Sequence, residues 1–172
     1  MDEPAHKRYL NDFFTGKHPG SDSRGELYND DPVTQDARFC GTTASMCGIE
    51  AALFEKNDEK LERGIREDLM LHAYMLTQSG IPMLYSSDEV GRLNDYSYKD
   101  DPDKAADSRY IHRGAFQWDL AKKRKSKTSV EGQIFQTLDR MEQIRRQESV
   151  FDKDCDVYTY DVHDDSILCI LR

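Results

Sequence analysis

The chain has 172 residues, enough for one ordinary domain, with a net charge of −9, 33% charged residues and a mean hydropathy of −0.82. The negative charge excludes a general nucleic-acid binder, which needs a basic face, and the basic run from Lys122 to Lys127 is interpreted as a solvated surface stretch. No apolar stretch is long enough to cross a bilayer, so neither nucleic acid nor membrane is an expected partner.

The cysteines are Cys40, Cys47, Cys155 and Cys169. They form no C-x-x-C pair, and no Cys/His spacing suits zinc, so neither a metal site nor a cofactor is predicted. Cys47 and Cys169 lie in apolar surroundings and are predicted to be buried thiols. Because the N-terminus carries no secretory signal, a reducing cytoplasm is the expected location.

The first half of the chain predicts two helices separated by a long loop. A short helix is expected over Met1–Phe14, followed by an irregular loop over Gly16–Arg38 that is rich in Gly, Pro, Ser, Asp and Asn. The second helix is expected over Leu61–Gln78, where apolar residues recur at three- and four-residue steps. Gly80 is predicted to end it.

A short apolar run follows that helix. Ile81–Tyr85 shows no alternation of apolar and polar residues, which is typical of a strand buried on both faces in a parallel sheet. The order helix, glycine, short buried strand is the second half of a β/α repeat.

The rest of the chain predicts a polar loop, a helix and a hairpin. Ser86–Thr128 is a long polar segment, and Thr128–Glu131 offers a capping box for a helix whose apolar face begins at Val130. Strands are expected over Val157–Val162 and Ser166–Leu171. This order indicates the closing unit of a β/α architecture in residues 1–148 and the start of a separate, truncated antiparallel β domain in residues 149–172.

The polar loop holds the candidate chemistry. In β/α barrels the loops after the carboxyl ends of the strands build the active site, and here Asp88 and Glu89 follow the predicted strand, with Arg109, Arg113 and Trp118 further on. Arginine forks and carboxylates suit sugar hydroxyls, which need donors and acceptors in fixed directions. The structural alternatives stay open: the two acids cap a turn, Arg109 pairs with Asp107, and Trp118 anchors a core.

Four stretches resemble one family. GIPMLYSSDEVGRLND resembles the eighth-strand motif of the α-amylase superfamily (glycoside hydrolase family 13), G-x-P-x-x-Y-x-G-[DE]-E, although Ser87 stands where the family usually has Gly. The stretch DEVGRLNDYSYKDDPDKAADSRYIHRGAFQWD is similar to the amylosucrase and sucrose hydrolase branch. SDSRGELYNDDPVTQDARFCGTTASMCGIE and GQIFQTLDRMEQIRRQESVF are similar to that branch's segment after the seventh strand and to its last barrel helix. The resemblance covers nearly the whole chain.

The resemblance implies the C-terminal part of a (β/α)8 TIM barrel, an α/β fold that in this chain is mostly helix and loop. It also implies a retaining double displacement on sucrose or α-glucans. The family's catalytic acids lie in motifs on the fourth, fifth and seventh strands, and none of these motifs occurs here. His163-Asp164 matches a motif in letters only and is rejected. No catalytic residue is therefore assigned, and the chain is expected to need the missing N-terminal part of the barrel as a partner.

The family's positions also suggest residues that bind the α-glucoside, whether sucrose or a maltooligosaccharide. By resemblance, Arg113 corresponds to the arginine at the pocket floor, with Arg109 as the alternative. Arg24 resembles an arginine on the acceptor side, and Asn94 and Asp95 are expected to shape the rim. The competing hypothesis is a non-catalytic carbohydrate-binding or assembly module derived from the same family.

Overall fold

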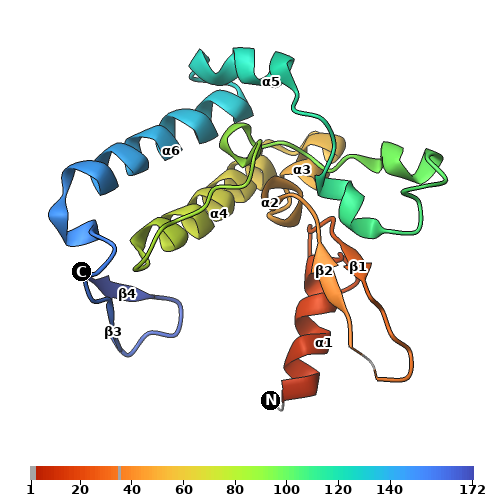
Figure 1. The fold of residues 1–172 in the computed structure, drawn as a ribbon, viewed down its shortest axis with the longest axis horizontal. Coiled ribbons are helices and arrows are strands. Elements are labelled where there is room, and N and C mark those ends of the chain that lie inside the picture. The colour runs from red at the N-terminus through yellow and green to blue at the C-terminus, as the bar shows by residue number, and fades with distance from the viewer. Residues whose placement is uncertain (1–2, 35) are drawn as a thin grey trace.

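The computed structural model describes residues 3–34 and 36–172. Figure 1 shows two long helices lying side by side, with a small hairpin near each end of the chain. The helices are α1 (Glu3–Phe14), α2 (Thr43–Met46), α3 (Ile49–Glu55), α4 (Asp58–Thr77), α5 (Trp118–Lys122) and α6 (Val130–Gln147). The strands are β1 (Glu26–Tyr28), β2 (Arg38–Cys40), β3 (Tyr158–Tyr160) and β4 (Cys169–Leu171). Short 3₁₀ helices are η1 (Asp88–Val90), η2 (Tyr96–Asp100), η3 (Ser108–His112), η4 (Lys123–Lys125) and η5 (Ser149–Phe151).

The expected N-terminal helix is confirmed as α1 over the residues that the structure describes, and positions 1 and 2 of the prediction lie outside them. The predicted loop over residues 16–38 is partly wrong, because β1 and β2 pair antiparallel with Leu27 opposite Phe39. Each of these strands spans three residues, and the segment around them is rich in the Gly, Pro, Ser, Asp and Asn that indicate a loop.

The core lies between α4 and α6, with α2 and α3 packed on α4. Its buried members are Ala44, Ile49, Ile65, Ile134 and Leu138. Both predicted long helices are confirmed, but their starts differ from the predictions. Helix α4 begins at Asp58 because Asn57 caps it by accepting the N–H of Lys60 at 3.0 Å. Helix α6 is capped by Ser129, whose hydroxyl accepts the N–H of Gly132 at 3.1 Å, and not by a box that begins at Thr128.

The prediction of a buried strand over Ile81–Tyr85 is wrong for this structure. The segment is not part of either two-stranded sheet, and exposed fractions of 81% for Ile81, 84% for Met83 and 50% for Tyr85 leave one of its faces bare. Leu84, which alternates with those residues, packs against the core between α4 and α6. A strand needs neighbours for its backbone groups, and the described residues supply no hydrogen-bond partner for the backbone of residues 81–84.

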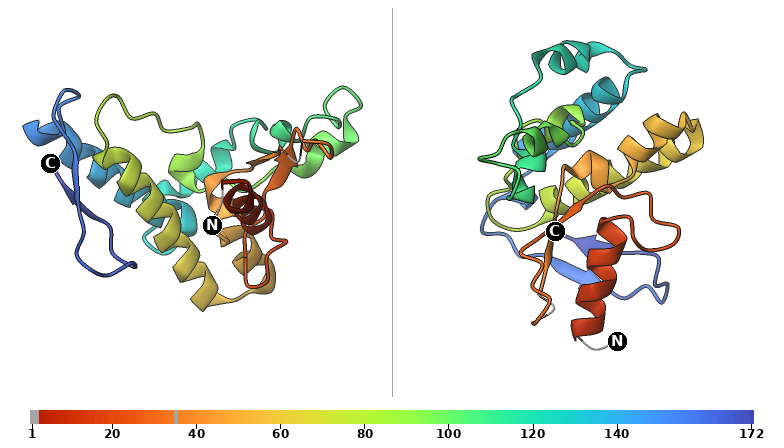
Figure 2. Two further views of the ribbon diagram at one scale, coloured as in Figure 1. Left: turned by 90° about the horizontal axis from the view of Figure 1, so that it is seen from below. Right: turned by 90° about the vertical axis from the view of Figure 1, so that its right-hand side faces the viewer.

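The C-terminal hairpin is confirmed, with β3 antiparallel to β4 and Thr159 opposite Ile170. It lies at the end of the α4–α6 pair, well away from α1 (Figure 2). The Arg172 guanidinium donates to the Ser79 hydroxyl at 3.0 Å, which ties the hairpin to the turn after α4. Cys169, in β4, is half-buried instead of buried as predicted, because the hairpin has no layer packed over it among the described residues, whereas Cys47 is buried.

The described residues contain no helix with the length and apolar character that a membrane crossing requires.

Candidate functional site

The turn after the apolar segment adopts a glycine-type conformation. Ser87 has φ of +83°, in the left-handed region that favours glycine, and glycine is the residue that the family usually carries there. The Glu89 carboxylate accepts the N–H of Ser87 at 2.6 Å and stabilises the turn. Asp88 and Glu89 lie in η1, directly after this turn. The interpretation of Glu89 as a turn cap is confirmed.

Asp88 points into the molecule, toward α2 and α4. Its Oδ2 accepts the Thr43 hydroxyl at 3.1 Å and lies 3.9 Å from Nε2 of His72. The other ring nitrogen of His72 lies 2.8 Å from the Asp68 carbonyl oxygen and 3.3 Å from its Oδ2. Sequence reasoning missed Asp68 and His72. The available signal was two titratable residues on the apolar stripe of α4, which also carries Ile65 and Leu76.

Arg109 is paired within the chain, as the structural alternative proposed. Its Nε and Nη2 each donate at 2.8 Å to the Asp107 carboxylate, and its guanidinium lies over the Tyr28 ring at 4.2 Å from the centroid. The hydrogen bond from Arg109 lowers the pKa of Asp107 to about 2. The Ser108 hydroxyl donates to the Leu27 carbonyl at 2.7 Å, so η3 is attached to β1.

Arg113 is exposed, and its neighbour in the sequence contacts the end of the apolar segment. The preceding residue, His112, packs edge-to-face on Tyr85 with ring centroids 5.6 Å apart. Burial and the charge of Arg113 lower the pKa of His112. The Arg113 guanidinium lies 5.7 Å from the centroid of the Tyr110 ring. Of the two candidate pocket arginines, Arg113 therefore has the side chain available to an outside partner.

Asn94 and Asp95 are engaged in local structure. The Asn94 Oδ1 accepts the N–H of Thr42 at 2.8 Å, and its Nδ2 donates to the carbonyl of Arg24. Asp95 caps η2 by accepting the N–H of Ser97 at 3.0 Å, and hydrogen bonds from Ser97 lower the pKa of Asp95. The structure thus brings Arg24 and Asn94 together through the Arg24 backbone, while the Arg24 side chain is exposed.

Trp118 begins α5 and is 73% exposed, so it is not a core anchor in this chain. Its indole meets the Phe116 ring at a centroid distance of 4.7 Å and an interplanar angle of 64°. The indole of Trp118 offers a flat aromatic face to solvent, with the half-buried Phe116 ring set against it at an angle.

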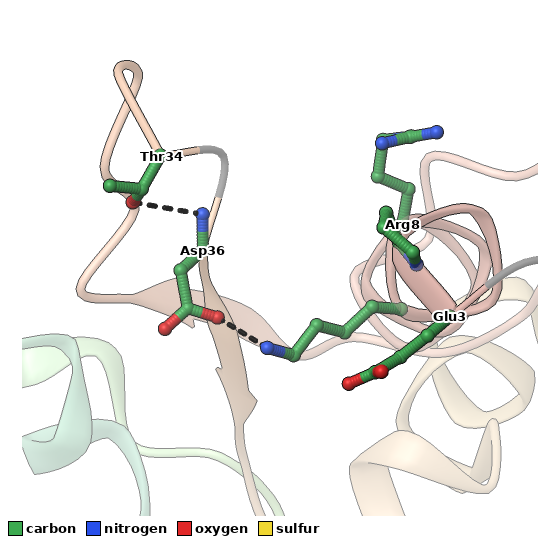
Figure 3. A pocket seen from close by; sticks show the side chains of 6 residues that line it. Glu3, Arg8, Thr34 and Asp36 are labelled. Atoms are coloured by element: carbon green, nitrogen blue, oxygen red, sulfur yellow. Dashed lines mark hydrogen bonds and ion pairs between the residues drawn. The ribbon is translucent and has the colours of Figure 1, made fainter.

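A shallow hollow lies between α1 and the loop of the β1–β2 hairpin (Figure 3). It measures about 180 Å³, and the Lys7 ammonium and the Asp36 carboxylate pair across it at 2.6 Å. None of its lining residues comes from the polar loop over residues 86–128. Among the described residues, no cluster of three or more His, Cys, Asp or Glu side chains is arranged to hold a metal ion.

A comparison of the chain with models of known protein families finds no match.

Proposed function

We propose that this chain is part of an α-glucoside-active enzyme of the amylosucrase type, which cleaves or transfers α-glucosyl groups from sucrose or α-glucans by a retaining mechanism. The supporting observation is the segment Ile81–Tyr85, which is bare on one face and whose residues 81–84 have no backbone hydrogen-bond partner among the described residues. Its Leu84 packs against the α4–α6 core, and the turn that follows the segment leads to Asp88 at the start of η1. A β/α unit with this arrangement requires neighbouring strands. In the proposed enzyme those strands come from the missing part of a (β/α)8 barrel.

The proposal assigns the chemistry and the binding to different parts of the enzyme. The nucleophile and the general acid/base belong to the part that this chain lacks, so the chain alone is inactive. Arg113 is the residue of this chain best placed to donate to a sugar or to a carboxylate beside it, because its guanidinium is exposed and unpaired with any carboxylate in the described structure. A cytoplasmic location, expected from cysteine usage, belongs to the same proposal.

The test is activity of a longer polypeptide that carries the remaining strands ahead of this sequence. The chain alone should release no glucose from sucrose, maltose or glucan, and the longer, folded protein should act on at least one of them. Arg113→Ala should lower kcat/KM by roughly 10- to 100-fold, the effect of losing one charged hydrogen bond. Arg146→Ala, which removes an exposed arginine from α6, is the matched control. A folded longer protein that ignores all three sugars would refute the substrate class.

A second candidate is a carbohydrate-binding module without catalysis, favoured by the exposed Trp118, which packs on Phe116. Aromatic faces offer flat apolar surfaces on which a sugar ring can lie. Trp118 is the single tryptophan, so intrinsic fluorescence reports on this position alone. Under this hypothesis, titration with a maltooligosaccharide shifts the emission of the isolated chain, and Trp118→Ala abolishes binding measured by calorimetry. A stable monomer with no heat of binding would exclude the module.

A further inference from the structure

Three titratable side chains form a line from the middle of α4 to the start of η1. Asp68 is 0% exposed and His72 is 5% exposed, while the Asp88 side chain is 11% exposed. His72 lies between the two acids, with Nδ1 3.3 Å from Asp68 Oδ2 and Nε2 3.9 Å from Asp88 Oδ2. The line therefore connects a helix of the core with the turn that follows the apolar segment.

The Asp68 carboxylate shows why His72 must carry charge. Within the described structure, both of its oxygens are buried and neither accepts a conventional hydrogen bond. A buried carboxylate without a compensating cation is costly, and the imidazole of His72 is the group in contact with it. Protonation of both ring nitrogens gives His72 a second N–H, which faces Asp88.

The other groups around His72 do not replace it. From α2, Thr43 is uncharged and donates its hydroxyl to Asp88. Cys47, just after α2, is a buried thiol whose pKa is raised by burial and by the nearby acids, so it stays neutral. From η3, His112 has a pKa lowered by burial and by Arg113. These neighbours leave the imidazolium of His72 between two carboxylates.

We propose that Asp68 and His72 are positioning residues for Asp88: they form a buried carboxylate–imidazolium–carboxylate chain that holds the Asp88 carboxylate at the end of the Ile81–Tyr85 segment. Asp88 then acts as a fixed anion and hydrogen-bond acceptor, and it does not supply a proton. The arrangement of Asp68, His72 and Asp88 is supported by the geometry of this polypeptide alone. Only the use of Asp88 in orienting an α-glucoside rests on the proposed function.

The protonation behaviour of His72 agrees with this geometry. Burial by itself would lower the pKa of His72, but its contacts with Asp68 and Asp88 outweigh burial and raise the pKa to about 10. Burial raises the pKa of Asp68, and His72 counteracts part of that rise. His72 and His112, both near Asp88, therefore shift in opposite directions.

The first experiment titrates the ¹⁵N-labelled histidines of the isolated chain by NMR. His72 should remain doubly protonated through pH 8 and lose its proton near pH 10, whereas His112 should be neutral at pH 8. Asp68→Asn and Asp88→Asn should each reduce the proton affinity of His72 by at least about tenfold, one pKa unit. Glu67→Gln, which removes an exposed acid next to Asp68 in the sequence, should leave it unchanged. Titration of wild-type His72 near pH 6.5, or no effect of Asp88→Asn, would overturn the proposal.

The second experiment asks whether His72 positions Asp88. His72→Gln keeps a hydrogen-bond donor but loses the charge, so the nuclear Overhauser contact between Thr43 and Asp88 should weaken, while Glu67→Gln should preserve it. An unchanged contact in His72→Gln would show that Asp88 is held without His72. Neither measurement involves a sugar. A lack of glucoside turnover in the longer enzyme would therefore not contradict the roles of Asp68 and His72, and a failure of these two experiments would not contradict the proposed function.

Discussion

Asn94 and Thr42, which are 52 positions apart in the sequence, are joined by a hydrogen bond of 2.8 Å from the Thr42 N–H to the Asn94 Oδ1. The backbone N–H of Asn94 in turn donates to the Ser45 hydroxyl at 2.9 Å, and Ser45 is fully buried. One asparagine thus connects the polar loop to the start of α2. Its amide forms hydrogen bonds within the fold, although the resemblance to the α-amylase superfamily predicts a place at the rim of a sugar pocket.

Replacing Asn94 should therefore change stability. Asn94→Ala leaves the Thr42 N–H without its acceptor and should reduce the free energy of unfolding by about 1–3 kcal/mol. Asn94→Asp keeps the acceptor but loses the donor to the Arg24 carbonyl, so its effect should be smaller. Urea unfolding monitored by circular dichroism measures both. An Asn94→Ala variant as stable as the wild type would refute this role.

The His72 imidazolium predicts a specific dependence of stability on pH. Folding raises the pKa of His72 from an ordinary value of 6.5 to about 10. As pH rises, the unfolded chain therefore loses this proton first. The contribution to stability is fully present below pH 6.5 and declines as pH rises to 10, by on the order of a few kcal/mol. Urea unfolding at several pH values should show the decline in the wild type and a flatter profile in His72→Gln; parallel profiles would contradict the prediction.

Gly91 and Gly80 provide a matched pair for backbone strain and packing. Both have positive φ, +60° and +86°, but a Cβ on Gly91 would lie 2.5 Å from Ile134 Cδ1, whereas one on Gly80 would meet nothing within 4 Å. Gly91→Ala should cost about 2–4 kcal/mol, because overpacking adds to conformational strain. Gly80→Ala should cost about 1 kcal/mol from strain alone. Thermal unfolding should rank the two variants in this order, and equal midpoints would show that the Gly91–Ile134 contact yields without cost.

The two faces of the apolar segment should respond differently to truncation. Leu84 packs against the core and Met83 is 84% exposed. In the isolated chain Leu84→Ala should reduce stability by about 1–2 kcal/mol, less than a fully buried leucine would. Met83→Ala should change it by about 0.5 kcal/mol or less. Chemical denaturation of both variants is the measurement, and a larger loss for Met83→Ala would mean that the bare face is covered in solution.

Arg109 and Arg113 should also separate in stability measurements. Arg109→Ala removes the paired hydrogen bonds to Asp107 and the contact with Tyr28, and should lower the unfolding midpoint slightly, since an exposed ion pair contributes little and the Arg109 side chain is 39% exposed. Arg113→Ala should lie within about 0.5 kcal/mol of the wild type. Differential scanning calorimetry can compare them. If Arg113→Ala were the more damaging change, Arg113 would be a structural arginine and a poor candidate for substrate binding.

The sequence by itself determined the elements whose information is local. The three- and four-residue spacing of apolar residues predicted α4 and α6, since a helix face repeats at that period. The pattern of the last residues predicted the β3–β4 hairpin. The prediction that Gly80 ends the helix was wrong in detail, because α4 ends at Thr77 with Gln78 as its C-cap, although Gly80 has a positive φ. The helix starts were less accurate, because Asn57 and Ser129 were not recognised as caps.

Only the tertiary structure decided which polar side chains meet. Asp68 and His72 are one helical turn apart, but their proposed positioning role depends on Asp88. The tertiary fold brings Asp88 close to His72. Likewise, Arg109 is neutralised by Asp107 and stacked on Tyr28, whereas Arg113, four residues later, stays exposed. The status of Ile81–Tyr85 was also decided there, because a strand exists only when other segments pair with its backbone. The propensity for a helix or a turn depends on a few neighbouring residues. The hydrogen-bond and ion-pair partners of a side chain depend on contacts between residues far apart in the sequence.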